Sequence, residues 1–181
     1  MISTKTRLCY PLFFQVPVGM IHYPPLQTKK NRKPMTKAVH NPAPISPELA
    51  KAYAEAQYQV ADPRATFTIH PGEYSPELMS LYLDNDTFSS ALLTAHNPLS
   101  NIVTDAENTA AQHALEAELT DIGFTFLSGY GCDGDGAWPR EVSALVLGID
   151  FETAKTISMR YGQNAFLFAS DDAVPKLILN R

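Results

Sequence analysis

Cysteine is scarce in this chain, since the 181 residues contain only Cys9 and Cys132. Two cysteines so far apart form neither a disulfide framework nor the ligand pair of a zinc site. This usage is typical of a reducing compartment, and we therefore expect a cytoplasmic protein. The run that starts at Asp133 begins like a calcium loop, but Ala137 occupies the third ligand position and the downstream glutamate is misplaced. We expect neither a metal nor a cofactor.

Long hydrophobic runs are also missing. The most apolar stretch, residues 8–21, is shorter than the ~20 residues of a membrane span, and it contains the helix breakers Pro11 and Pro17. No small-residue cleavage site follows it. We therefore expect neither a signal peptide nor a transmembrane helix, and no membrane partner.

Acidic residues are absent from the N-terminal segment. Residues 1–37 hold seven basic residues and no acid, so the rest of the chain has the other seven basic residues against all 19 acidic ones, a net charge of −12. Such an acidic surface repels nucleic-acid phosphates. Nucleic-acid binding is therefore not expected of the folded part.

Hydrophobic periodicity is absent from residues 1–44, which prolines interrupt repeatedly. Two interpretations remain open for this segment. It is either a disordered basic tail with a linker, or an upstream reading of a start codon that lies at Met35. Residues 45–181 are expected to fold as a single α+β domain.

An added α-β-α segment is expected to open this domain. Ser46-Pro47-Glu48-Leu49 supplies an N-cap, a first-turn proline and a first-turn acid, which together predict a helix from 47 to about 59. The same tetrapeptide returns at Ser75 and predicts a second helix. Between them, residues 65–70 form a short β-prone run that ends at a Pro-Gly pair and predicts a strand.

A longer helix is predicted over residues 105–122. Thr104 and Glu107 have the spacing of a capping box, in which each side chain bonds the backbone N–H of the other residue. Apolar residues then recur on one helical face until Gly123, a residue type that commonly ends helices.

Continuous apolar runs without alternation predict four strands that are covered on both faces. With two helices they give the order β-α-β-β-α-β, which predicts a ferredoxin-like core over about residues 89–169. A further strand is expected at the edge of the sheet near the C-terminus. The predicted ranges are 89–95, 124–128, 142–149 and 165–169 for the core strands, 150–161 for the second helix, 129–141 for a glycine-rich loop, and 176–179 for the edge strand.

Right-handed crossovers in this topology bring three polar segments to one edge of the sheet. They are the turn His96-Asn97-Pro98, the 129–141 loop and the start of the fourth strand, and the first turn of the 105–122 helix joins them. We predict a functional site at this edge. The ligand-binding candidates are Asn97, Asn108, Trp138, Gln163 and Asn164, and the catalytic candidates are His96, Glu107 and Glu141.

Most of these candidates also have a purely structural interpretation. Asn97 precedes a proline and is suited to starting a turn, and Gln163-Asn164 is suited to closing a helix. Glu107 fits a helix cap better than a general base. Trp138 either stacks on a planar ligand or covers the edge of the core. Asn108 has no such alternative, and we expect it to bind an anion or a carbonyl group beside the free N–H groups of the helix.

Several short motifs resemble those of the bacterial family named domain of unknown function 3293. The resemblance spans about residues 50–181 and implies the fold and the position of the site, but it implies no activity. The family has a tryptophan in place of His96 and a Glu-Pro pair in place of Arg140-Glu141. The motifs that carry the resemblance are Thr94-Ala-His-Asn-Pro98, Glu107-Asn108, Trp138, Leu147-Gly-Ile-Asp150 and Tyr161-Gly-Gln-Asn-Ala165.

Three functions are therefore kept in order of preference. The first is binding of a small polar metabolite or nucleotide through amides at the sheet edge. The second is a protein-protein interaction module, including a homodimer, in which the amides are structural. The third is an enzyme that uses Glu107 or Glu141 with His96.

Removal of residues 1–34 is expected to leave the domain folded, because the segment is broken by prolines and has no periodic apolar face to pack. Thermal unfolding followed by circular dichroism checks this. A large drop in the melting temperature of the truncated protein would contradict the expectation.

Overall fold

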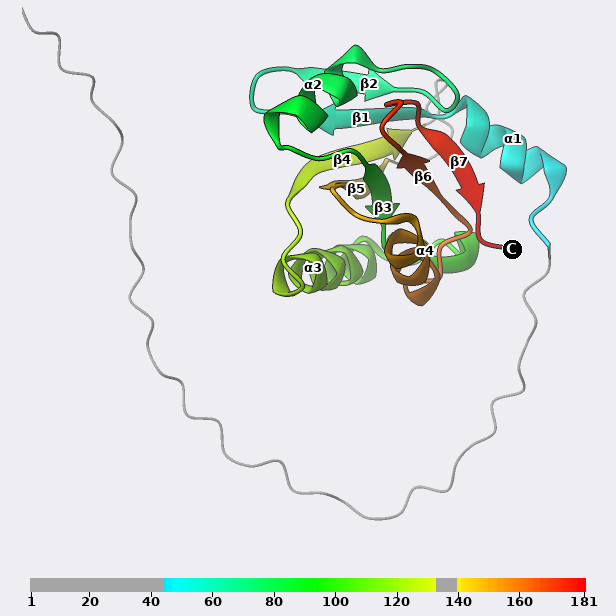
Figure 1. Cartoon of the computed structure of the whole chain (residues 1–181). Helices are drawn as coiled ribbons and strands as arrows, with labels where there is room; N and C mark the ends of the chain where they lie inside the picture. The colour runs from blue at the N-terminus through cyan, green and yellow to red at the C-terminus, as the bar shows by residue number, and fades with distance from the viewer. Residues whose placement is uncertain (1–43, 133–139) are drawn as a thin grey trace, which may run out of the picture. The chain divides into compact units, whose positions relative to one another are not determined.

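The computed structural model describes residues 44–132 and 140–181 (Figure 1). The description below concerns the compact unit that spans residues 41–181. The predicted tail, the calcium-like sequence and Trp138 lie outside the described residues.

The described part of this unit contains four α-helices, a short 3-10 helix and seven strands, which confirms the α+β class. The strands form a single sheet in the order β2-β1-β4-β5-β3-β6-β7, and every neighbouring pair is antiparallel. The elements are α1 Pro47–Glu55, β1 Gln57–Ala61, β2 Thr66–Ile69, α2 Pro76–Asp84, β3 Ser90–Thr94, η1 Pro98–Ser100, α3 Asp105–Asp121, β4 Phe126–Cys132, β5 Glu141–Leu147, α4 Phe151–Arg160, β6 Ala165–Ala169 and β7 Lys176–Leu179.

The register of the central strands decides which segments meet at the sheet edge. Thr94, at the end of β3, lies opposite Ser143 near the start of β5, and Glu141 lies opposite Gly131 near the end of β4. On the other side of β3, Leu92 lies opposite Leu167 of β6. The turn after β3 is therefore at the same edge as the start of β5 and the start of β6.

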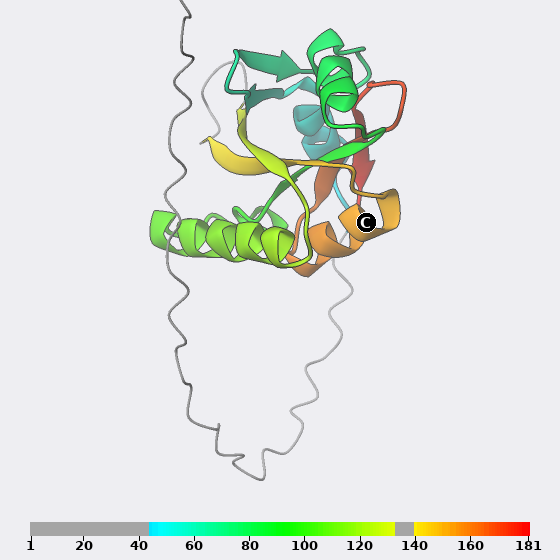
Figure 2. The ribbon, with the colours of Figure 1, turned by 60° about the vertical axis from the view of Figure 1, so that its left-hand side comes forward.

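Alternate residues of the strands fill two separate cores, as the two-residue period of a strand requires. Leu92, Leu145 and Leu167 face α2 and the hairpin of β1 and β2. Ala91 and Leu93 face α3 and α4 on the opposite side of the sheet. Figures 1 and 2 show α3 and α4 together under one face and α2 over the other. Among the described residues, no helix is both long and apolar enough to cross a membrane.

All four predicted helix starts are confirmed, because a polar N-cap side chain accepts a backbone N–H in each helix. Ser46, Ser75 and Asp150 accept from the third residue after them, and Thr104 makes a reciprocal capping box with Glu107. These bonds satisfy N–H groups that have no partner within the helix. The helix starts therefore follow from local sequence.

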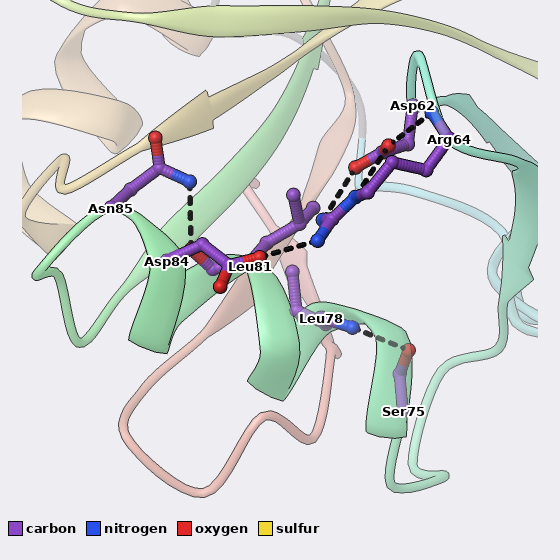
Figure 3. Close-up of polar contacts among 7 residues, drawn as sticks. All are labelled: Asp62, Arg64, Ser75, Leu78, Leu81, Asp84 and Asn85. Carbon is purple, nitrogen blue, oxygen red and sulfur yellow. Dashed lines mark hydrogen bonds and ion pairs between the residues drawn. The ribbon is translucent and has the colours of Figure 1, made fainter. Parts of the chain in front are cut away.

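The hairpin of β1 and β2 is tied by an ion pair to the C-terminal end of α2 (Figure 3). Arg64 in the hairpin turn bonds both Asp62 and Asp84, the last residue of α2. The guanidinium group of Arg64 is largely exposed to solvent, so these ion pairs stabilise the fold by less than the core does. At the end of α2, Asn85 Nδ2 donates to the carbonyl oxygen of Leu81 at 2.8 Å and caps the helix.

The predicted helix over 47–59 was wrong at its C-terminal end. The helix stops at Glu55, Ala56 is extended, and residues 57–61 form β1. β1 is held on both sides by pairing with β2 and β4, a non-local interaction that overrides helix propensity. The sequence predicted strands near both partners, at 65–70 and 124–128, but no local signal marked residues 57–61 as the strand between them.

The predicted loop 129–141 was also too long, because β4 continues to Cys132. Its two glycines pair with β1 as strand residues. A Cβ atom at Gly129 would lie 2.7 Å from the carbonyl oxygen of Gln59, so the close approach of β1 requires glycine there. Glycine in this segment therefore marks tight strand packing.

Leu115→Ala and Leu147→Ala are each expected to lower the free energy of unfolding by about 2 to 5 kcal/mol through the cavity they leave. The two side chains are 0% and 7% exposed and belong to the two different cores. Denaturant unfolding measures the loss. Leu83→Ala is the control, because Leu83 is 74% exposed, and three indistinguishable midpoints would show that the cores are misplaced.

Candidate functional site

Two cavities lie between α1 and the sheet, where β4 ends and β5 begins. They share the lining residues Tyr53, Tyr58, Gly131 and Glu141, and we refer to the two together as the α1 cleft. Their volumes are about 70 and 140 Å³. Leu92 and Leu167 belong to the lining of the smaller one, so it opens on the α2 side of the sheet.

The smaller cavity has both polar and apolar lining residues, and they are far apart in the sequence. Its polar lining consists of Tyr53, Tyr58, Thr94, Asn97, Ser100, Glu141, Ser143 and Gln163. The larger cavity is mostly apolar, and its remaining lining residues are Leu49, Ala52, Ala56 and Cys132. We call them the polar cavity and the apolar cavity.

Asn97 and Asn108 lock the turn after β3 onto the first turn of α3. The backbone N–H of Asn97 donates to Asn108 Oδ1 at 2.8 Å, and Asn108 Nδ2 donates to Asn97 Oδ1 at 3.1 Å. Val103 N also donates to Asn97 Oδ1, at 3.2 Å. Both asparagines are buried. The side-chain amide of Asn97 makes one further hydrogen bond: Nδ2 donates to Glu141 Oε1 at 2.8 Å, which joins β5 to the same network.

A second network joins the turn to β6 and α1. Gln163 Nε2 donates to the backbone carbonyl of His96 at 2.8 Å. Asn164 Nδ2 donates to Ser100 Oγ at 2.6 Å and to the Tyr53 hydroxyl at 3.1 Å. Ser100 Oγ and the Tyr53 hydroxyl lie 2.9 Å apart and share a hydrogen bond. Helix α1 is thereby anchored over the end of the sheet.

The turn itself adopts left-handed backbone conformations at Asn97, Leu99 and Ser100, with φ of 44°, 57° and 58°. Such conformations cost roughly 1 kcal/mol or more for residues with a Cβ, and Leu99 and Ser100 have no short amide to offset this. The backbone N–H of Leu99 donates to the carbonyl of Gly162 at 2.8 Å, which holds the strained turn. The conformation brings Ser100 to Tyr53 and Asn164.

The interpretation of Glu107 as a helix cap is confirmed. Glu107 Oε2 accepts from Thr104 N at 3.0 Å and from Thr104 Oγ1 at 2.7 Å. These bonds lower the pKa of the Glu107 carboxyl, and the side chain does not line the α1 cleft.

His96 is partly buried, and its burial lowers the pKa of the imidazole, while Glu141 and Asp105 act in the opposite direction. The ring does not line either cavity, whereas Glu141 lines both. An enzyme that uses Glu141 with His96 stays a prediction. Within the part of the chain that the structure describes, no group of His, Cys, Asp and Glu could hold a metal ion.

The structure brings four of the five predicted ligand-binding residues to one place, with Trp138 outside the described residues. Asn97 and Gln163 line the polar cavity, while Asn108 and Asn164 lie behind it and support the turn. The sequence prediction missed Tyr53, Tyr58 and Ser143. Tyr58 was missed together with β1, and its burial, with the nearby Tyr53 and Glu141, raises the pKa of its hydroxyl.

A family model described as "Protein of unknown function (DUF3293)" matches residues 93–166. The family resemblance is thereby confirmed for this segment. The DUF3293 segment runs from β3 to β6 and contains Asn97, Asn108, Glu141 and Gln163, while α1 with Tyr53 precedes it. Neither a curated protein nor a solved structure matches the chain.

Asn108→Ala is expected to lower the free energy of unfolding by about 1 to 3 kcal/mol, because it leaves the buried N–H of Asn97 without its acceptor. Denaturant unfolding measures the change. Thr109→Ala, at the next and exposed position of α3, is the matched control. Equal stabilities of the two variants would contradict a structural role for the asparagine pair.

Proposed function

We propose that this protein binds a small polar molecule in the α1 cleft. The observation that carries the proposal is that polar side chains from α1, β1, β3, the following turn, β5 and the segment just before β6 line one small cavity. Ligand sites are typically concave, with a few polar groups that converge on an apolar surround. The apolar cavity beside the polar one supplies that surround.

The charge of the cleft favours a metabolite over a nucleotide. Glu141 is an acid, and no Lys, Arg or His is among the described residues that line either cavity. A phosphate group would therefore meet a like charge, with no cation among the described lining residues to offset it. A nucleotide site usually offers Arg, Lys or a helix N-terminus to the phosphates instead.

We further propose that β3 to β6 form a ferredoxin-like core, with α1, β1, β2, α2 and β7 added to it, in a cytoplasmic protein. The strand order β4-β5-β3-β6 with α3 and α4 on one face supports the core. On this view the cleft forms where the core meets the added helix α1. The low number of cysteines supports the compartment.

A second candidate function is a protein-protein interaction module. It is favoured by the burial of the Asn97 and Asn108 amides against each other, which gives them a structural role. Leu83 and Phe88 are 74% and 68% exposed and offer apolar area outside the cleft. Sedimentation equilibrium of the full chain and of the Leu83→Ser, Phe88→Ser variant tests for a homodimer through these residues.

A thermal-shift screen against a panel of small metabolites is expected to find a ligand that raises the melting temperature of the full chain. Binding to the folded state alone stabilises it in proportion to the logarithm of the ligand concentration over the dissociation constant. Ala52→Trp is expected to abolish the shift, because Ala52 is exposed on α1 and lines the apolar cavity.

Ala54→Trp is the matched control, since Ala54 is exposed on the same helix and lines neither cavity. It is expected to keep the ligand-induced shift. A ligand whose effect survives Ala52→Trp would bind elsewhere, and that result would overturn the proposed site.

A further inference from the structure

We propose that the α1 cleft is specific for an aliphatic primary amine in its ammonium form. The ammonium group would lie in the polar cavity beside Glu141, and the aliphatic part would lie in the apolar cavity. This inference rests on the proposed function and names the class of its ligand.

The hydroxyl groups that line the polar cavity offer acceptors, because three of them give their hydrogen to backbone carbonyls. Tyr58 donates to the carbonyl of Tyr53 at 2.8 Å. Thr94 Oγ1 donates to the carbonyl of Val142 at 2.7 Å, and Ser143 Oγ donates to the carbonyl of Glu141 at 3.1 Å. A hydroxyl has one hydrogen, so these oxygens can offer a ligand only lone pairs, and one lone pair of Thr94 Oγ1 already accepts from His96 N.

The amide N–H groups are also used within the protein. Asn97 Nδ2 donates to Glu141 Oε1, and Gln163 Nε2 donates to the carbonyls of His96 and Tyr161. Asn164 Nδ2, behind the cavity, donates to both Ser100 and Tyr53. Among the donors described for the cavity, one hydrogen of the Asn97 amide and one hydroxyl hydrogen of the Tyr53 and Ser100 pair remain for a ligand.

The cavity therefore offers more acceptors than donors, which favours a ligand that donates several hydrogen bonds. An ammonium group has three N–H donors and no acceptor, which complements oxygen atoms of Tyr58, Ser143 and Glu141. A carboxylate accepts several hydrogen bonds at once, so Glu141 can accept from an ammonium group in addition to the partners it has. A carboxylate or phosphate ligand would meet mainly acceptors and a like charge.

The apolar cavity determines what the ammonium group is attached to. Glu141, Tyr53 and Tyr58 line both cavities, so a group beside Glu141 is continuous with the space under α1. Leu49, Ala52 and Ala56 complete that space with apolar side chains. A short aliphatic chain buries apolar area there without leaving a polar group unpaired.

Three probes of nearly equal length test this: n-butylammonium, 1-butanol and butyrate. Each is titrated into the ¹⁵N-labelled full chain, and the shifts of the Gly131 and Ser143 amides are followed by NMR. n-Butylammonium is expected to bind about tenfold or more tightly than 1-butanol, because a hydrogen bond to a charged group contributes about 1.5 to 3 kcal/mol. Butyrate is expected to leave both amides unshifted.

Glu141→Gln is expected to weaken n-butylammonium binding about tenfold, to the level of 1-butanol, since the amide oxygen still accepts from Asn97 but the charge is gone. Glu73→Gln, an exposed position outside both cavities, makes the same change of net charge and is expected to have no effect.

The preference among the three probes is measured on the unaltered protein, so it decides the inference even if Glu141→Gln fails to fold. Tighter or equal binding of 1-butanol or butyrate, or no shift with n-butylammonium, overturns the ammonium inference. The metabolite panel tests the proposed function separately. If Ala52→Trp abolishes the binding of a neutral or anionic metabolite, the α1 cleft is still a ligand site and only the inference of an amine ligand is wrong.

Discussion

The hydrogen-bonded pair of Asn97 and Asn108 is the interaction on which the rest of the site depends. It fixes the turn after β3 to the start of α3 with both polar side chains buried. Once Asn97 is fixed, the hydrogen bond from its side-chain Nδ2 holds Glu141, the first residue of β5, in place. Buried polar groups of this kind specify a single arrangement, because any other leaves a donor or acceptor unpaired.

The left-handed turn depends on that arrangement, and the position of helix α1 depends in turn on the left-handed turn. The turn places Ser100 where it meets Tyr53 of α1 and Asn164, the residue before β6. No residue of α1 is fully buried, so the helix is held over the sheet by these polar contacts as much as by apolar packing. An element held in this way leaves room beneath it, and the α1 cleft occupies that room.

The sequence predicted those parts of the fold that local signals determine. Caps fixed the start of each helix, and apolar runs fixed β3, β5 and β6, as well as the edge at which Asn97 and Gln163 meet. It did not predict β1, which needs pairing on both sides, nor the contribution of Tyr58 to the cleft. It did not predict the hydrogen bond between Asn108 and Asn97 either, because that pairing is set by tertiary structure and not by neighbours in the chain.

A double-mutant cycle between Asn97 and Asn108 tests most directly whether this pair organises the site. The free energies of unfolding of the protein, Asn97→Ala, Asn108→Ala and the double variant are measured by denaturant unfolding. The account predicts that the two single changes are strongly non-additive, with a coupling energy of about 1 to 3 kcal/mol for residues in direct contact. Additive effects, with a coupling energy near zero, would contradict it.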